Sequence, residues 1–446
     1  MNLSMRKIAT GVGFILTAPN IAHADLIFKD DQLEILTRNF HFYREYENGG
    51  SNPSGANSQL PSSERNKTRN EWAQGFVAKY SSGYTDTPIQ LGFEAYGLLG
   101  VKLYSDTYET GTLLLQYDPT TGKTKSTYGE VGGALKLKYK DTVITYGDQF
   151  PYVPVLATST VRLLPTVSTG VSLQDKSFNN LLINAGYFYS MNPLDSTKDL
   201  NYFTTDYGAG IRANSISYVG GTYTFPQASL TAYVSELEDV WNQVFVGGTY
   251  LKKIDEDQKL KLGFTGFSNT DTGKKNGGDI EAYIFSAMTD YSYKNHTFSL
   301  GYQQVFGNEP FDIAGFSSAG SNNLNYNVAQ YSTFSEAHEK SLQVKYEVEM
   351  TPYGIPGLTL MGRYFYGWDI DNSHSNNPFY TKRYVYDPSI DYIHRETNLQ
   401  AAYKVQSGFA KGLDFKLRYA SSRATKGYRY DDIDELRTIV EYTFKF

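Results

Sequence analysis

The amino-acid sequence predicts an all-β fold, an 18-stranded antiparallel transmembrane β-barrel. Three observations predict it: apolar and polar residues alternate along the chain, short and long connections alternate between the strands, and an export segment precedes them. The 446 residues include 39 Tyr, 26 Phe and 40 Gly but no Cys, which excludes disulfides and thiolate metal sites. Mean hydropathy is −0.44 and no uncharged apolar run approaches the length of a membrane-spanning helix, so a helical membrane protein is excluded.

Residues 1–24 have the composition of a secretory signal peptide. Arg6 and Lys7 precede the apolar stretch Ile8–Ala18, and Ala22-His23-Ala24 forms an A-x-A cleavage site. The apolar stretch is too short to span a bilayer as a helix. A short buried N-terminal helix is the alternative. We expect residues 1–24 to be removed on export and residues 25–446 to form the barrel.

Strands with one apolar and one polar face recur through residues 25–446. Leu135–Tyr139 and Leu413–Tyr419 alternate apolar and charged residues. From Leu436 to Phe446 every second residue is apolar or Thr, and the charged residues of this segment occupy the other face. Ile439 is the exception. Such period-two alternation predicts strands that have one face in an apolar environment.

Connections of two lengths alternate between these strands, which is the pattern of an outer-membrane barrel. A closed barrel pairs every backbone group within lipid. A soluble sandwich remains the alternative, but aromatic clusters such as Tyr364–Tyr366 fit an interfacial girdle, and the terminal Phe446 resembles the signature read by the barrel assembly machinery. The short connections include 225–227, 294–296 and 352–356, and the long ones are 44–70, 104–128, 191–206, 307–335 and 370–392.

Several motifs, in order along the chain, resemble the OprD family of outer-membrane porins, also called outer-membrane carboxylate channels. The resemblance implies an 18-stranded barrel whose third and seventh external loops, about 151–165 and 307–335 here, fold inward and narrow the pore. The motifs are Arg38-Asn39-Phe40, residues 71–76, 96–103, 162–165, 236–239, 339–341, 353–359 and 394–399.

A set of basic residues is predicted to line the pore. Alternation places Arg363, Lys416, Arg418 and Arg437 on the polar, lumen-facing side of their strands. Guanidinium groups bind carboxylates in bidentate fashion and stay charged, so a row of them can pass an anion from site to site. The alternative for each is an ion pair with a wall carboxylate. The family resemblance adds Arg44, Arg69 and Arg162, although Arg44 and Arg69 could instead lie on a solvated loop.

Two further segments bear on selectivity. Lys136 and Lys138 also face the lumen by alternation. In the loop 307–335 the tip 317–327 is rich in Ser, Gly and Asn, which fits a flexible surface loop as well as an ordered one. Residues Tyr331–Phe334 lack the acid that the resemblance implies for channels of basic amino acids. This departure argues against a preference for cationic amino acids.

The sequence therefore predicts a substrate-selective porin of the bacterial outer membrane that takes up small carboxylate-bearing solutes passively, with amino acids and carbapenem-type antibiotics as candidates. The alternative is a non-conducting barrel acting as an adhesin, a structural protein or a barrel enzyme. No H-E-x-x-H, G-x-S-x-G or P-loop motif is present, so we expect no enzyme activity, cofactor or strong metal site, although Asp431-Asp432 could bind a divalent cation weakly. Expected partners are outer-membrane lipid, lipopolysaccharide and the assembly machinery; the net charge of −6 disfavours nucleic acid, and the barrel is expected to be a monomer or a weak homotrimer.

Overall fold

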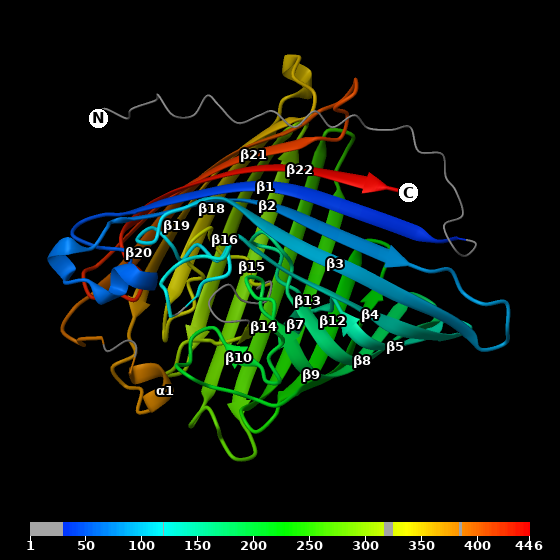
Figure 1. Cartoon of the computed structure of the whole chain (residues 1–446), viewed down its shortest axis with the longest axis horizontal. Coiled ribbons are helices and arrows are strands. Elements are labelled where there is room, and N and C mark those ends of the chain that lie inside the picture. The colour runs from blue at the N-terminus through cyan, green and yellow to red at the C-terminus, as the bar shows by residue number, and fades with distance from the viewer. Residues whose placement is uncertain (1–29, 119, 316–323, 383–385) are drawn as a thin grey trace.

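The computed structural model describes residues 30–118, 120–315, 324–382 and 386–446. The predicted signal peptide and residues 317–323 of the predicted loop tip lie outside the described residues. Eighteen long strands form one sheet in which every strand pairs antiparallel with its neighbours. The sheet closes into a barrel because the first strand, β1 (Gln32–Tyr46), also pairs with the last, β22 (Ile433–Lys445), and the two lie side by side in Figure 1. The predicted fold and strand number are confirmed.

The remaining wall strands follow the chain around the barrel. They are β2 (Thr68–Ser81), β3 (Gln90–Ser105), β4 (Thr127–Tyr139), β5 (Thr142–Gln149), β8 (Val167–Phe178), β9 (Leu181–Asn192), β11 (Ile216–Thr224), β12 (Ala228–Leu237), β13 (Trp241–Lys253), β14 (Gln258–Asp271), β15 (Glu281–Tyr293), β16 (His296–Phe306), β18 (Lys340–Glu349), β19 (Leu358–Ile370), β20 (Tyr392–Lys404) and β21 (Asp414–Ala424). Among the described residues no helix is both long and apolar enough to cross a membrane.

The two faces of each strand differ as the alternation predicts. In β22 Leu436 is exposed on the outer wall, whereas Glu435 and Arg437 are buried on the inner wall. Ile439, which breaks the pattern, faces inward and is buried in a cluster with Phe40 and Leu163. An apolar residue is tolerated on the inner face there because an inward-folded loop covers it.

The connections at the two ends of the barrel have different lengths. At one end the strands are joined by tight turns such as residues 140–141, 179–180 and 294–295. At the other end, six connections are long: 47–67, 106–126, 150–166, 193–215, 307–339 and 371–391. Because outer-membrane barrels have short periplasmic turns and long external loops, the long connections mark the extracellular end. The predicted long connections are all present, and their bounds differ by at most four residues, except that the connection predicted to end at residue 206 extends to residue 215.

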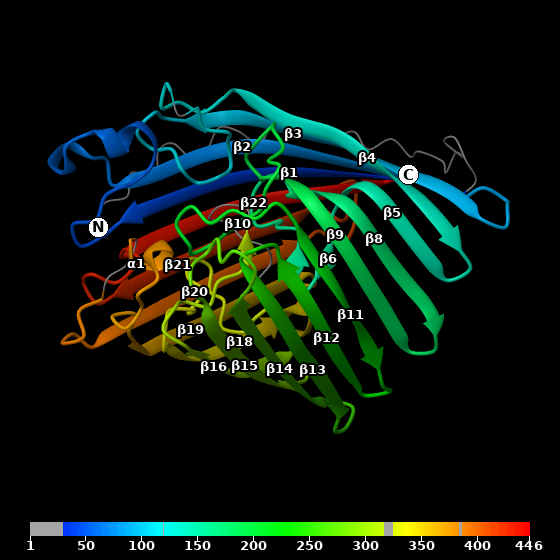
Figure 2. The same ribbon diagram turned by 90° about the horizontal axis from the view of Figure 1, so that it is seen from below.

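Segments of four external loops fold into the barrel. The loop 150–166 carries β6 (Tyr152–Val153) and β7 (Leu156–Ala157), while β10 (Thr204–Thr205) pairs with β17 (Ala314–Gly315) and so joins the loops 193–215 and 307–339. Figure 2 shows β6 and β10 within the ring of long strands. The sequence predicted inward folding for two of these loops. The loops 106–126 and 193–215 also contribute buried residues, including Leu114 and Phe203.

The rest of the loop structure is short. The external loops carry the 3₁₀ turns Gly55–Gln59 and Ser62–Glu64 and the single-turn helix α1 (Pro378–Thr381), and a third 3₁₀ turn, Thr351–Tyr353, lies in a periplasmic connection. In the described part of the predicted tip, Asn325 and Asn327 are buried. Asn327 Nδ2 donates to Ser341 of the wall at 2.9 Å, so this part of the tip is packed.

Candidate functional site

Strand register brings most of the predicted basic residues onto one side of the inner wall. Glu435 of β22 lies opposite Arg44 of β1, which lies opposite Arg69 of β2. In the next row toward the periplasm Arg418 of β21 lies opposite Arg437 of β22. The alternation along each strand places all five residues on the lumen-facing side, where they are neighbours. Arg44 and Arg69 therefore lie within β1 and β2, although the predicted connection 44–70 included both residues.

A cavity of about 1050 Å³ lies between this wall and the inward-folded loops. Five of the seven predicted basic residues line it. The predicted lining residues are Arg44, Arg69, Arg162, Arg418 and Arg437, and they are joined by a sixth arginine, Arg429, and by Phe42, Tyr207, Tyr331, Tyr430 and Asp195 among others. Arg363 and Lys416 do not line the cavity.

Glu435 neutralises part of this positive charge. Its Oε2 accepts hydrogen bonds from Arg44 Nε at 2.8 Å and Arg44 Nη2 at 2.5 Å, and its Oε1 accepts one from Arg437 Nε at 2.6 Å. Arg44, Glu435 and Arg437 are all buried. Buried charges need such partners because leaving one unpaired costs several kcal/mol. The trio keeps one net positive charge, and its two guanidinium groups are held in fixed positions.

Arg69 and Arg162 have neutral hydrogen-bond partners, and neither makes an ion pair within the described residues. Arg69 donates to Ser54 Oγ at 2.6 Å and to the carbonyl oxygen of Gly111 at 2.7 Å. Arg162 Nε donates to the carbonyl oxygen of Thr112 at 2.8 Å. The Arg69 contacts bind the loops 47–67 and 106–126 to the wall, and the Arg162 contact binds the loop 150–166 to the loop 106–126. Both arginines place a cation at the cavity.

Arg418 differs from the other arginines of the cavity. Within the described part of the chain its guanidinium makes no hydrogen bond and no ion pair, although it lines the cavity beside Arg437. A cation with five donors and no protein acceptor can bind an anionic solute without first breaking a protein contact. Arg418 is the residue of this site best suited to bind a carboxylate.

The other predicted cations face inward outside the cavity. Arg363 Nε donates to Asn398 Oδ1 at 3.0 Å. Lys416 Nζ lies 2.7 Å from Glu441 Oε2 and 3.2 Å from an oxygen of Asp414, toward the periplasmic end of β21. The ion pair that the sequence offered as an alternative therefore holds for Lys416.

Three other basic residues continue this inner surface. Arg38 donates to Glu441 Oε1 at 2.5 Å and to the carbonyl oxygen of Arg162 at 2.5 Å. Lys136 is buried, as expected for a lumen-facing residue, and its Nζ donates to Ser81 Oγ at 2.7 Å. Lys138 Nζ lies 5.1 Å from the centre of the Tyr84 ring.

The wall carboxylate that holds the constriction loop, Glu396, was not among the predicted site residues. Glu396 of β20 accepts backbone N–H hydrogen bonds from Gln330 at 2.9 Å, Tyr331 at 3.0 Å and Ser332 at 3.1 Å, and one from Ser332 Oγ at 2.8 Å. Charge-assisted hydrogen bonds are about twice as strong as neutral ones. Glu396 therefore fixes residues 330–332 across the lumen. The available signal was the alternation along the strand, which places Glu396 on the lumen-facing side.

A second carboxylate joins two loops to each other. Asp312 accepts the backbone N–H groups of Tyr207 and Gly208, each at 2.9 Å, and the hydroxyl of Tyr380 at 3.2 Å. It thereby connects the loop 307–339 with the loop 193–215 and with α1. The constriction is thus a cross-linked assembly of several loops.

Asp195 makes the cavity sensitive to pH. Burial raises the pKa of its carboxyl to about 6, although Arg162 opposes that shift. Between pH 7 and pH 5 we expect Asp195 to take up a proton, so that the cavity loses one negative charge and the anion-to-cation permeability ratio rises. Reversal potentials of single channels at both pH values would measure this change. In Asp195→Asn the step should become smaller; a step of undiminished size in that variant would contradict the assignment.

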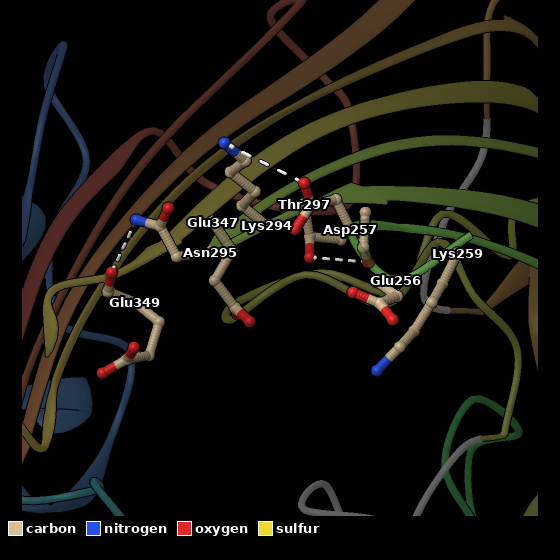
Figure 3. A pocket seen from close by; sticks show the side chains of 9 residues that line it. Glu256, Asp257, Lys259, Lys294, Asn295, Thr297, Glu347 and Glu349 are labelled. Carbon is tan, nitrogen blue, oxygen red and sulfur yellow. Dashed lines mark hydrogen bonds and ion pairs between the residues drawn. The ribbon is translucent and has the colours of Figure 1, made fainter. Parts of the chain in front are cut away.

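A smaller hollow lies at the periplasmic mouth. It has a volume of about 230 Å³ and is lined by residues of the turns at 254–257 and 294–295 and by Glu347 and Glu349 (Figure 3). Lys294 Nζ lies 3.9 Å from Asp257 Oδ2, and both side chains are more than half exposed. The turn Asp255–Asp257 is therefore solvated, as its composition predicts.

No metal centre is found in the described residues, where no three His, Asp or Glu side chains are grouped to hold an ion. Asp432, one of the two acids considered for weak cation binding, instead accepts hydrogen bonds from Asn48 Nδ2 at 2.5 Å and from the backbone N–H of Ala424 at 2.8 Å. These contacts hold the ends of two external loops together.

An 18-stranded membrane barrel with external loops folded inward around an arginine-lined cavity defines a porin of the bacterial outer membrane, a channel protein and not an enzyme. The chain belongs to the OprD family of outer membrane porins, because the sequence profile of that family matches residues 27–446.

Curated relatives agree with this assignment. The chain is 36% identical to Porin D of Pseudomonas aeruginosa over 430 residues, which cover 94% of this chain and 92% of that protein. It is 28% identical to the porin-like protein GalP of Pseudomonas putida over 427 residues, covering 93% and 92%.

Solved structures of the family are similar throughout their length. The crystal structure of Pseudomonas aeruginosa OprD matches with a TM-score of 0.77 and 33% identity over 94% of this chain and 96% of that chain. The structure of Pseudomonas aeruginosa OpdK with vanillate matches with a TM-score of 0.81 and 26% identity over 94% and 100%.

Proposed function

We propose that this porin admits small carboxylate-bearing solutes passively and that their carboxylate binds Arg418. The observation that carries the proposal is a guanidinium without a protein partner, among the described residues, in a cavity lined by six arginines. A hydrogen bond to a charged group contributes about 1.5–3 kcal/mol. Such a contact is strong enough to select a solute and weak enough to release it, as conduction requires.

The neighbouring cations supply a route to and from Arg418. Arg69 and Arg162 keep their charge at the cavity, and the Arg44–Glu435–Arg437 trio adds one net positive charge beside them. Beyond the cavity, the partner of Arg363 within the described residues is the neutral Asn398, and Arg38 and Lys416 share Glu441. We infer that a carboxylate moves along this inner surface toward the periplasm in several weak steps.

Among the described residues, the six arginines that line the cavity outnumber its two acids, Asp195 and Asp206. Glu396 and Glu435 are occupied by loop N–H groups and by arginines, respectively. Residues Tyr331–Phe334 contain no acid. The cavity therefore supports anions and zwitterions, including amino acids and carbapenem-type antibiotics, better than cationic amino acids. The relative OpdK has been solved with vanillate, whose carboxylate is the group that the Arg418 site would bind.

Recording from the purified, full-length exported protein in planar bilayers tests the proposal. We expect open channels with anion selectivity under a KCl gradient, and faster liposome swelling with monocarboxylates than with neutral or cationic solutes of equal size. Absence of conductance would contradict the proposal and favour a non-conducting adhesin or structural barrel. Equal swelling rates for all solutes would show a sieve without carboxylate selectivity.

We also propose that residues 1–24 are a signal peptide that is cleaved after Ala24. The basic start, the apolar segment and the A-x-A motif support this. Sequencing the amino terminus of protein isolated from outer membranes should give Asp25 as the first residue.

A further inference from the structure

We propose that Arg429, on the external loop 425–432, is the outermost cation of the solute path and that Glu336 sets its effective charge. The inference rests on the proposed function, because it extends the path for anions beyond the wall strands. Sequence alternation could not indicate Arg429, which lies between β21 and β22 and not on a strand. It lines the same cavity as Arg418 and Arg437.

Three loops hold the Arg429 side chain in place. Its Nη1 donates to Glu336 Oε1 of the loop 307–339 at 2.8 Å. Its guanidinium carbon lies 3.6 Å from the centre of the Tyr207 ring, in the loop 193–215, and 4.7 Å from the centre of the Tyr430 ring. The faces of tyrosine rings attract cations. Arg429 therefore has a fixed position at the extracellular side of the cavity.

Two tyrosines connect Arg429 to the arginines of the wall. The rings of Tyr430 and Tyr331 meet edge to face with their centres 5.3 Å apart. The guanidinium carbon of Arg44 lies 4.4 Å from the centre of the Tyr331 ring. Arg429, Tyr430, Tyr331 and Arg44 thus form one continuous surface. An anion arriving from outside meets Arg429 before it reaches the wall.

Glu336 is fixed as firmly as the arginine that it pairs with. It is buried, its Oε2 accepts the Tyr386 hydroxyl at 3.2 Å, and its backbone N–H donates to Glu339 Oε2 at 2.9 Å. A carboxylate so restrained lowers the positive potential that Arg429 presents to the cavity. Removing that carboxylate charge should raise the potential, whereas removing the guanidinium should lower it.

The direction in which each variant changes the anion-to-cation permeability ratio separates this role from a structural one. Arg429→Gln and Glu336→Gln both break the same ion pair, so a clamp that only holds loops together predicts that both variants change selectivity in the same direction. A cation that acts on the solute predicts a lower anion-to-cation permeability ratio in Arg429→Gln and a higher ratio in Glu336→Gln. Arg429→Lys keeps the charge and should keep the ratio of the wild type.

Reversal potentials of single channels under a KCl gradient are the readout, since only folded, inserted channels conduct. We expect a change of about twofold or more in each direction. The matched control is Arg212→Gln, because Arg212 also lies over a tyrosine, 4.4 Å from the Tyr202 ring centre, but does not line the cavity. Shifts of equal sign, or a shift in Arg429→Gln no larger than in Arg212→Gln, would overturn the proposal. KCl selectivity needs no carboxylate solute, so failure of the carboxylate preference itself would be seen separately in liposome swelling.

Discussion

Replacing Arg418 with glutamine is expected to weaken the binding of a carboxylate solute in the pore by about 10- to 100-fold. The magnitude follows from the loss of one charged hydrogen-bonding partner, about 1.5–3 kcal/mol, at about 1.4 kcal/mol for each factor of ten. Little stability should be lost, because the Arg418 guanidinium has no hydrogen-bond or ion-pair partner in the described chain. Block of the KCl current by increasing concentrations of a monocarboxylate measures the affinity.

Arg423→Gln is the matched control for this experiment. Arg423 belongs to the same strand, β21, but faces the outer wall, where its Nη2 lies 3.0 Å from Asp434 Oδ2. The variant Arg423→Gln should leave the block of the KCl current by a monocarboxylate unchanged. If Arg418→Gln binds the carboxylate as tightly as the wild type, Arg418 is not the binding residue and the proposed route is wrong.

Replacing Glu396 with alanine is expected to release residues 330–332 from the wall and to enlarge the pore. The substitution removes the acceptor of three backbone N–H groups and one hydroxyl, each worth about 1.5–3 kcal/mol as a hydrogen bond to a charged group. Asn398 Oδ1 also accepts the N–H of Gln330, at 3.1 Å, but the N–H groups of Tyr331 and Ser332 lose their acceptor. We expect a higher single-channel conductance, more frequent current fluctuations and swelling rates that no longer depend on solute charge.

The variant Glu347→Gln is the control, because it removes a carboxylate charge from the lumen without removing an acceptor of the constriction loop. Glu347 lines the hollow beside the periplasmic turns (Figure 3) and does not line the cavity of the constriction. The single-channel conductance of Glu347→Gln should resemble that of the wild type. An unchanged conductance in Glu396→Ala would show that the loop is held without the carboxylate.

The wall of the barrel could be predicted from the sequence because it depends on local alternation. A strand with one face in lipid and one in the lumen must change polarity at every residue, so Leu436 and Arg437 are assigned to opposite faces without knowledge of their neighbours. Ile439 could not be assigned in this way. The inward-facing side chain of Ile439 is covered by Leu163. Leu163 is distant in sequence and reaches Ile439 only because the loop 150–166 folds inward.

The sequence predicted which arginines line the candidate site, but it did not predict which of them are paired with a carboxylate. Inward parity identified Arg418 and Arg437, and the family resemblance added Arg44 and Arg162. Arg44 and Arg437 share Glu435, whereas Arg418 has no hydrogen-bond or ion-pair partner among the described residues. This difference depends on side-chain reach across strands, which alternation does not encode. Glu396 and Arg429 were missed because their roles arise from contacts with loops more than 60 residues away.

The pairing of β1 with β22 also dictates when the solute site can exist. Arg44 belongs to the first strand and its partner Glu435 to the last, about 390 residues later, so the two meet only at the seam where the cylinder is sealed. Contacts between such distant residues form late and slowly. The Arg44–Glu435 ion pair therefore forms only when the two end strands pair, so the complete arginine site exists only in a closed barrel.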